Sequence, residues 1–325
     1  MAKTEFVELD HREQIDHITA LAREALLAYP FEVRSLEVIN FEFNATFKIE
    51  STSNETFALR VNVNSERTFA NLQAEIALVA FLNESKKVTL PHPIANKAGQ
   101  FAQTIFSPLM KKELGVVLYS WLDGEVLGDE PSEESLKELG AAMAHMHQEA
   151  QSFVLPTGSE LPVLRDFMWG TTDVLFSEES VIEIDEKKEL ERVRQAIEEI
   201  IQDLYEKEDP IAIHADLHGW NVMTFGDELL IFDFDDSGIG LRVQDLATSL
   251  YYLDTPEQDA ALLEGYQSIM DLPVFSQYQM KGLLLQRRII LLNYLFDTTN
   301  VEHREMAPNY LVETLRRSRE FLEQR

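Results

Sequence analysis

The sequence contains no cysteine, and cations are scarce in it. Without cysteine the chain can form neither a disulfide nor a zinc site with thiolate ligands. Lys and Arg number 28 against 57 Asp and Glu, a formal net charge of -29. This charge repels nucleic acid phosphates and anionic lipid headgroups, so we expect neither nucleic acid nor a membrane as a partner. It fits either an acidic, solubilising surface or attraction of a cationic substrate.

Long apolar runs are also absent. Arg287 and Arg288 interrupt the most apolar stretch, residues 283–296, which therefore does not suit a membrane-spanning helix. The N-terminal segment MAKTEFVELDHREQ lacks the apolar region of a secretory signal peptide. These features predict a cytoplasmic protein.

The composition and the length indicate a globular chain with more than one part. Hydrophobic residues make up 45% of the sequence and aromatic residues 10%, which excludes a disordered chain. A chain of 325 residues is longer than one typical domain. The length therefore favours two lobes or one large domain with a sizeable core.

The first third of the chain has the pattern of short strands around one helix. Residues 65–83 place apolar side chains at three- and four-residue intervals, as one face of a helix does. Alternation of apolar and polar residues predicts antiparallel strands in five segments: 36–43, 45–51, 56–61, 101–106 and 115–121.

After Leu122 the pattern becomes mainly helical. Residues 132–150 and 186–207 show long helical periods. Two short apolar segments, 211–214 and 229–234, are expected to form a hairpin through Gly226-Asp227, with HADLHGWN (214–221) as a loop inside it. The fold class is thus α+β in two lobes. Residues 1–118 form an N-terminal lobe with an antiparallel sheet plus one helix, and residues 119–325 form a mainly helical C-terminal lobe.

Three polar residues stand at or just beyond the ends of these short segments. Asp216 lies five positions before Asn221 and seventeen before Asp233. In phosphoryl transfer one carboxylate orients the attacking hydroxyl, while a second carboxylate and an amide oxygen hold magnesium against the nucleotide phosphates. The chain offers this set of groups.

The motifs around these residues resemble those of a known superfamily. His214-Ala215-Asp216-Leu217 with Asn221, and Ile231-Phe232-Asp233-Phe234-Asp235, look like the catalytic loop and metal motif of the aminoglycoside phosphotransferase and choline kinase superfamily, which has a protein-kinase-like fold. The longer string IFDFDDSGIGLRVQDLATSLYYL is similar to type II homoserine kinases and bacterial stress-response kinases. The resemblance implies an ATP- and Mg²⁺-dependent kinase with a small hydroxyl acceptor. It also implies Asp216 as catalytic base, Asn221 and Asp233 as metal ligands, and Asp245 as a support of the catalytic loop.

The segment Phe57-Ala58-Leu59-Arg60-Val61 provides an independent check. On a strand, Ala58 and Arg60 share one face, as the small residue beneath adenine and the phosphate-binding cation of kinases do. Glu75 projects inside the apolar arc of the predicted helix, where an unpaired carboxylate would be costly. We therefore expect an Arg60–Glu75 ion pair like that of kinases; the alternative is that Glu75 reaches solvent at the edge of the arc.

Two features depart from the kinase pattern. The cation is Arg60 where kinases usually have lysine, and the two side chains are not interchangeable. The expected nucleotide-covering loop, residues 42–47, contains no glycine.

Other residues have a functional and a structural explanation. By resemblance, the backbone of Tyr119, Ser120 and Trp121 binds the adenine edge, although their side chains equally suit strand-end packing. Trp220 and His218 flank Asp216 and could line the acceptor site, but tryptophan is more often packed core. His147 resembles a histidine of relatives, and capping of a helix C-terminus also explains it.

Other function classes remain open. His214, Asp216 and His218 form an HxDxH cluster that could bind metal in a hydrolase. A non-catalytic nucleotide-binding pseudokinase is a second alternative. A protein kinase is disfavoured, because Asp233 and Gln244 are only eleven positions apart, too few for a peptide-docking segment.

Overall fold

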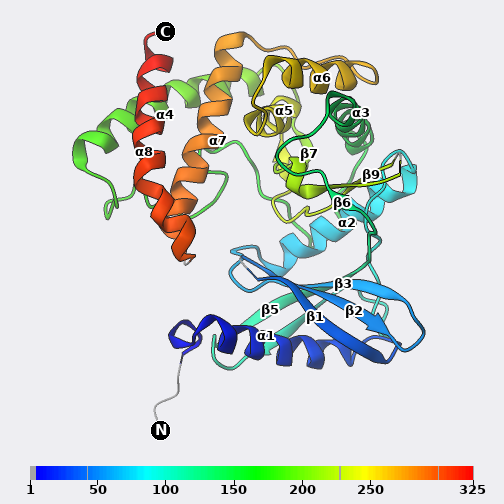
Figure 1. The fold of residues 1–325 in the computed structure, drawn as a ribbon. Helices are drawn as coiled ribbons and strands as arrows, with labels where there is room; N and C mark the ends of the chain where they lie inside the picture. The colour runs from blue at the N-terminus through cyan, green and yellow to red at the C-terminus, as the bar shows by residue number, and fades with distance from the viewer. Residues whose placement is uncertain (1–4, 42, 227, 299, 325) are drawn as a thin grey trace. The chain divides into compact units, whose positions relative to one another are not determined.

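The computed structural model describes residues 5–41, 43–226, 228–298 and 300–324 (Figure 1). The first four residues of the N-terminal segment, Glu42 of the expected nucleotide-covering loop and Asp227 of the expected hairpin turn lie outside them. The chain divides into two compact units, which are described separately. Unit 1 runs to Gly124 and includes Val154–Glu160, and unit 2 comprises Glu125–Phe153 and Leu161 onward. Within the described ranges, no helix combines the length and the apolar character needed to cross a membrane.

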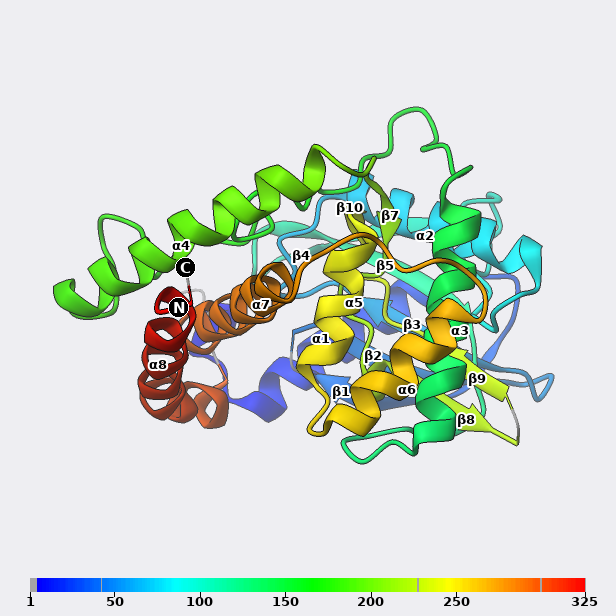
Figure 2. The ribbon, with the colours of Figure 1, turned by 90° about the horizontal axis from the view of Figure 1, so that it is seen from above.

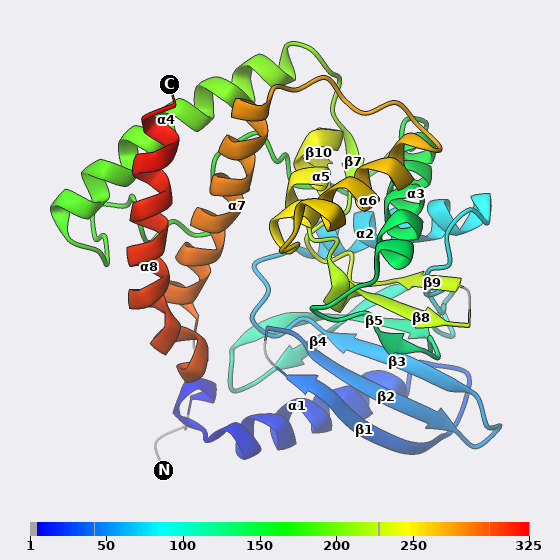
Figure 3. The same cartoon turned by 45° about the horizontal axis from the view of Figure 1, so that its top comes forward.

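A five-stranded antiparallel sheet forms the centre of unit 1 (Figure 3). Its strand order is β1-β2-β3-β5-β4. The strands are β1 (Val33–Phe41), β2 (Ala45–Ser51), β3 (Thr56–Val61), β4 (Ala102–Ser107) and β5 (Lys112–Ser120). Each of the five segments that alternation predicts is a strand here, because a sheet with different surroundings on its two faces imposes the period of two.

Each face of this sheet carries a helix. Helix α1 (His11–Leu26) packs its apolar side on the face that presents Phe57, Leu59 and Val61, and together they form the core of the unit. Helix α2 (Phe69–Ser85) sends Glu75 to the opposite face, where it meets Arg60. A short 3₁₀ turn, η1 (Phe6–Glu8), precedes α1.

The strand pattern predicts one helix in this part of the chain, and the structure corrects this to two. The sequence does contain a signal for α1. Asp10 accepts a hydrogen bond from the Glu13 N–H, and Glu13 returns one to the Asp10 N–H, a helix-initiating capping box. Ile18, Leu21 and Ala25 then follow at helical spacing and are buried.

Unit 2 contains two small sheets. Strand β7 (Ile211–Ile213) pairs with β10 (Gly238–Gly240), and β8 (Val222–Phe225) lies between β6 (Glu125–Val126) and β9 (Glu228–Ile231). The expected hairpin between 211–214 and 229–234 is therefore wrong. The hairpin is β8–β9, and HADLHGWN lies between β7 and β8, ending in the 3₁₀ turn η2 (Gly219–Asn221).

Helices make up most of unit 2. They are α3 (Glu133–Ala150), α4 (Ile184–Tyr205), α5 (Arg242–Tyr251), α6 (Pro256–Gln267), α7 (Gln277–Asp297) and α8 (Val301–Leu322). Helices α4, α7 and α8 pack against one another, and α7 also packs on α5 (Figure 1). The antiparallel sheet of unit 1 and the helices of unit 2 confirm the α+β class.

Helices α3 and α6 are in backbone contact (Figure 2). A Cβ on Gly140 would lie 2.0 Å from the Leu262 carbonyl oxygen, and one on Gly265 would lie 1.9 Å from that of Lys137. Only glycine fits at either position. The close packing brings His147 of α3 within 2.9 Å of the Tyr266 hydroxyl on α6.

Candidate active site

The loop 214–221 is held in a strained backbone conformation immediately before Asp216. Ala215 has a φ of 66°, in the left-handed region that L-residues other than glycine, asparagine and aspartate rarely adopt. Oδ1 of Asp245 accepts the Ala215 N–H at 2.8 Å, and Oδ2 accepts the His214 N–H at 3.2 Å. Asp245 thus holds the two residues before Asp216 from the first turn of α5.

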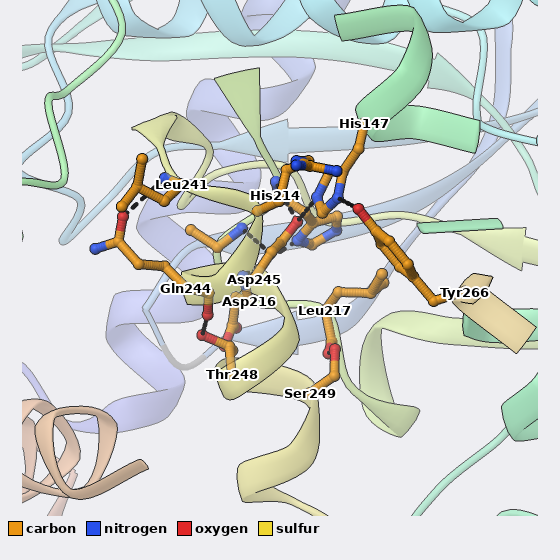
Figure 4. A network of polar contacts seen from close by, with 12 residues as sticks. His147, His214, Asp216, Leu217, Leu241, Gln244, Asp245, Thr248, Ser249 and Tyr266 are labelled. Carbon is orange, nitrogen blue, oxygen red and sulfur yellow. Dashed lines mark hydrogen bonds and ion pairs between the residues drawn. The ribbon is translucent and has the colours of Figure 1, made fainter. Parts of the chain in front are cut away.

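Asp245 is the centre of a buried network (Figure 4). Nε2 of His147 donates to Oδ2 of Asp245 at 2.9 Å, and the other ring nitrogen of His147 contacts Tyr266. The hydroxyl of Ser249, also on α5, donates to the carbonyl of Leu217 at 2.5 Å. Helices α3, α5 and α6 therefore all contribute to the position of the loop.

The charge of Asp245 follows from this network. Burial alone would raise the pKa of Asp245, but the hydrogen bond and charge of His147, the His214 ring and the Ala215 N–H together lower it. The carboxylate is therefore ionised while fully buried. The support that Asp245 gives to the loop is confirmed as a contact.

His214 connects the loop to the segment that carries Asp233. Its Nε2 donates to the Phe232 carbonyl at 3.0 Å, and its Nδ1 accepts the Asp216 N–H at 3.3 Å. Burial lowers the pKa of His214, so the ring is neutral and can make both bonds.

Asp216 is surrounded by donors. Nδ2 of Asn221 donates to its carbonyl at 2.8 Å and to its Oδ2 at 3.2 Å, and Nε2 of His218 lies 3.4 Å from Oδ2. The other carboxylate oxygen, Oδ1, forms an ion pair with Nη2 of Arg287. Burial alone would raise the pKa of Asp216, but the charge of Arg287, with His218, lowers it to about 2.

Asn221 and the segment 232–233 are neighbours through the β8–β9 hairpin. Val222 pairs with Ile231, and the Phe232 N–H donates to the Asn221 carbonyl at 3.1 Å. Asp233 follows directly, with a left-handed φ of 63°. Left-handed backbone therefore occurs next to one expected functional carboxylate, Asp216, and at the other, Asp233. Such conformations are common at functional sites.

The donor set fits a magnesium ion. Because the Asn221 amide nitrogen donates to Asp216, its amide oxygen is left as an acceptor, and Asp233 adds an exposed carboxylate. Mg²⁺ prefers oxygen ligands and commonly binds through one or two protein groups plus phosphates and water. Asn221 and Asp233 would be those two groups.

The HxDxH metal centre is not supported. No group of three His, Asp or Glu residues that could hold a metal occurs among the residues the structure describes. Both ring nitrogens of His214 are already engaged, one as donor and one as acceptor.

A small pocket adjoins the loop on the side of Gly219. The Gly128 N–H donates to the Gly219 carbonyl at 3.0 Å, and a Cβ on Gly219 would lie 2.0 Å from the Gly128 oxygen. Nε1 of Trp220 donates to Oδ1 of Asp129 at 2.6 Å. The polar and aromatic lining consists of Asp129, His218, Trp220, Ser249 and Tyr252. Trp220 is 54% exposed, so its interpretation as packed core is wrong.

The predicted ion pair of unit 1 is present. Nη2 of Arg60 donates to Oε2 of Glu75 at 2.5 Å, with side chains only 10% and 5% exposed. Tyr119 donates to the other oxygen of Glu75 at 3.0 Å, and Nε of Arg60 donates to Asn62. The alternative, that Glu75 reaches solvent, is therefore wrong.

The remaining predicted nucleotide residues lie on the same side of this sheet or at its edge. Ala58 pairs with Lys48 on β2 and with Tyr119 on β5, so all three side chains share the face of Arg60. The Lys48 ammonium lies 4.8 Å from the centre of the Trp121 ring, directly after β5. This face therefore has two cations, Arg60 and Lys48.

Sequence patterns do not identify two residues of the site, Arg287 and Tyr252, and they leave the role of His147 open. Arg287 is visible only as a charge within an apolar stretch, yet it contacts Asp216, and Tyr252 accepts a hydrogen bond from it at 2.8 Å. His147 contacts Asp245 and does not cap its helix. The available signal for Arg287 was its place inside an apolar helix, where an arginine needs a partner.

Comparison with known proteins identifies the family of the chain. Residues 38–278 match the phosphotransferase enzyme family, APH, and the chain belongs to this family. The protein sll1119 of Synechocystis sp., itself uncharacterised, is 26% identical over 238 residues. The match covers 70% of this chain, which spans only 64% of the length of that relative.

Solved structures share the fold. A microcompartment-associated aminopropanol kinase matches with a TM-score of 0.80 and 21% identity, covering 94% of this chain and 98% of that one. Amicoumacin kinase hAmiN, in complex with AMP-PNP, Ca²⁺ and Ami, matches with a TM-score of 0.76 and 17% identity, covering 94% and 96%. These structures confirm the kinase-like fold, and the family match over residues 38–278 confirms the predicted superfamily.

Proposed function

We propose that the protein is an ATP-dependent phosphotransferase that moves the terminal phosphoryl group to a hydroxyl of a small acceptor. The observation that carries this proposal is the arrangement of Asp216 and Asn221 on one strained loop, with Asp233 on the adjoining hairpin. Membership of the phosphotransferase enzyme family supports it.

Asp216 would orient the acceptor hydroxyl and take its proton. A carboxylate with a pKa of about 2 is a weak base. It suffices because phosphoryl transfer proceeds through a loose transition state, in which positioning contributes more than proton removal. Asn221 and Asp233 would hold Mg²⁺, which neutralises charge on the phosphates when it is bound.

Unit 1 would bind the nucleotide. Arg60, held by Glu75 and Tyr119, presents a fixed guanidinium, and Ala58 leaves room beside it on the same face for the adenine. The backbone around Tyr119 and Trp121 would bind the adenine edge. The boundary between the proposed lobes, residues 1–118 and 119–325, falls at these residues.

A small acceptor with an amino group is favoured. The carboxylate of Asp129 and the rings of Trp220 and Tyr252 line the pocket beside Asp216, and such groups bind ammonium ions. The net charge of -29 attracts cations. Aminopropanol and amicoumacin kinases share the fold, which supports an acceptor of this kind.

The test is ADP release with ATP and magnesium over a panel of hydroxylated amines, amino acids and sugars. Asp216→Ala should keep nucleotide affinity within about threefold and lower turnover by about 10³-fold, the middle of the range for loss of a positioned acid or base. Asp209→Ala, an exposed aspartate of the same unit, is the matched control. Unchanged turnover of Asp216→Ala would reject its role, and nucleotide binding without ADP release for any acceptor would favour the pseudokinase alternative.

A further inference from the structure

Arg287 differs from its neighbour Arg288 in how its donors are used. Arg288 donates to Thr314, Tyr251 and the Tyr310 carbonyl, and its guanidinium stacks 3.9 Å from the Tyr310 ring centre. Every one of these contacts ties α7 to α5 or α8, which is a structural role. Arg287 instead directs Nη2 to Asp216 and to the Tyr252 hydroxyl.

The guanidinium of Arg287 is not fully satisfied. Its side chain is only 8% exposed, and its Nε is buried without a hydrogen-bond partner among the residues that the structure describes. Buried donors are almost always paired, so an orphan beside a catalytic carboxylate points to a ligand. Burial of a guanidinium is itself costly.

Support of Asp216 does not explain this arginine. Asp245 and Ser249 already hold the loop through hydrogen bonds to its backbone. The Asp216 carboxylate already accepts a hydrogen bond from Asn221. The positive charge of Arg287 also makes Asp216 a weaker proton acceptor. Arg287 is therefore not needed to hold the loop, and it does not strengthen the expected base.

Arg287 and Asp216 each contact a side chain that lines the pocket. Tyr252, which accepts from Arg287, lines the pocket, and so does His218, which lies 3.4 Å from Asp216. A ligand that extends from this pocket would meet a carboxylate that orients a hydroxyl and a guanidinium that has a donor to spare. Planar guanidinium forks suit carboxylates and other oxyanions.

We propose that Arg287 is a specificity-determining residue that binds a carboxylate of the acceptor, so that the preferred acceptors are hydroxy acids bearing an amino group and not simple amino alcohols. The proposal rests on the phosphotransferase function above. The carboxylate of the acceptor meets the guanidinium of Arg287, and the hydroxyl meets Asp216.

The test uses pairs of acceptors that differ only by the carboxylate. Serine pairs with ethanolamine, threonine with 1-amino-2-propanol, and homoserine with 3-amino-1-propanol. Calorimetry measures binding, and ADP release measures kcat/KM, for the wild type, Arg287→Gln and Arg287→Lys. Arg242→Gln is the matched control, because it also removes an arginine paired with a carboxylate, Glu208, in the same unit, and the Arg242 side chain is likewise mostly buried.

In the wild type, the carboxylated member of at least one pair should bind about tenfold more tightly or more, which corresponds to ~1.4 kcal/mol. The ratio within that pair should fall to about one in Arg287→Gln, take an intermediate value in Arg287→Lys, and persist in Arg242→Gln. If Arg287→Gln does not fold, the ratio within each pair is compared between the wild type and Arg287→Lys, and this comparison still tests the proposal.

Three outcomes overturn the proposal: a wild type that binds no carboxylated member, a wild type that prefers the amino alcohols, or a ratio that Arg287→Gln leaves unchanged. An equal loss on both members of each pair is one form of the third outcome, and it would indicate a contact with the nucleotide phosphates. Carboxylate binding through Arg287 without ADP release would uphold this site and reject the phosphotransferase function, so the two failures are distinguishable.

Discussion

Nε2 of His147, on α3, donates a hydrogen bond to Oδ2 of Asp245, on α5, at 2.9 Å, and both side chains are buried. The same carboxylate accepts the backbone N–H groups of His214 and Ala215. A helix contact 98 residues away in sequence thereby fixes the backbone next to Asp216. The loop conformation depends on a charge that lies entirely within the protein.

The substitution Asp245→Asn tests this dependence. Asparagine keeps one oxygen acceptor but loses the charge, so one of the three donors is left unpaired in the core. We expect the free energy of unfolding to fall by about 2–4 kcal/mol. Turnover should fall by about 10²-fold through misplacement of Asp216, with nucleotide affinity little changed.

Urea unfolding and ADP release measure the two effects of Asp245→Asn. Asp254→Asn, an exposed aspartate shortly after α5, serves as control and should change neither quantity. A folded Asp245→Asn variant with wild-type turnover would show that the left-handed Ala215 does not need this carboxylate.

The Arg60–Glu75 pair leads to a second prediction, in unit 1. Glu75→Gln retains an acceptor for Tyr119 but leaves the buried Arg60 uncompensated, so we expect a loss of about 3 kcal/mol in the free energy of unfolding. The freed guanidinium is no longer held in place, and the KM for ATP should rise about tenfold, equivalent to ~1.4 kcal/mol. The KM for the acceptor should not change.

The control for Glu75→Gln is Arg34→Gln, which breaks the exposed Arg34–Glu50 pair of the same sheet. An exposed pair contributes little, so its loss should cost less than about 1 kcal/mol. Equal destabilisation by the two variants would contradict the assignment of a buried, functional ion pair. A KM for ATP that Glu75→Gln leaves unchanged would separate Arg60 from the nucleotide.

The sequence predicts those parts of the site that depend on local patterns. Strand alternation places Ala58 and Arg60 on one face, and helical spacing directs Glu75 into the apolar arc, so their pairing follows from two local periods. Asp216 and Asn221 are five positions apart in the sequence, and the structure places both in one short loop, where their side chains are hydrogen-bonded.

Contacts between distant segments are not visible in such patterns. The Arg287–Asp216 pair spans 71 positions, and no local period relates α7 to the loop. The pairing of β7 with β10 was not predictable either, because strands of three residues carry too little alternation to define a partner. Trp220 was expected in the core because apolar size favours burial, whereas its indole N–H bonds Asp129 at the rim of a pocket.

The buried ring of His214 leads to the last prediction, the stability of the protein in mild acid. Burial holds the pKa of His214 below its usual value near 6.5, so the unfolded chain takes up a proton at a pH where the folded protein does not. The free energy of unfolding should therefore fall as the pH drops below about 6.5. Protonation would also remove the acceptor that Nδ1 offers to the Asp216 N–H. His214→Gln cannot titrate, so its urea midpoint should change less between pH 7 and pH 5.5 than that of the wild type, whereas His92→Gln, at an exposed histidine, should follow the wild-type curve. A wild type and a His214→Gln variant with equal pH slopes would contradict the neutral, buried state of this histidine.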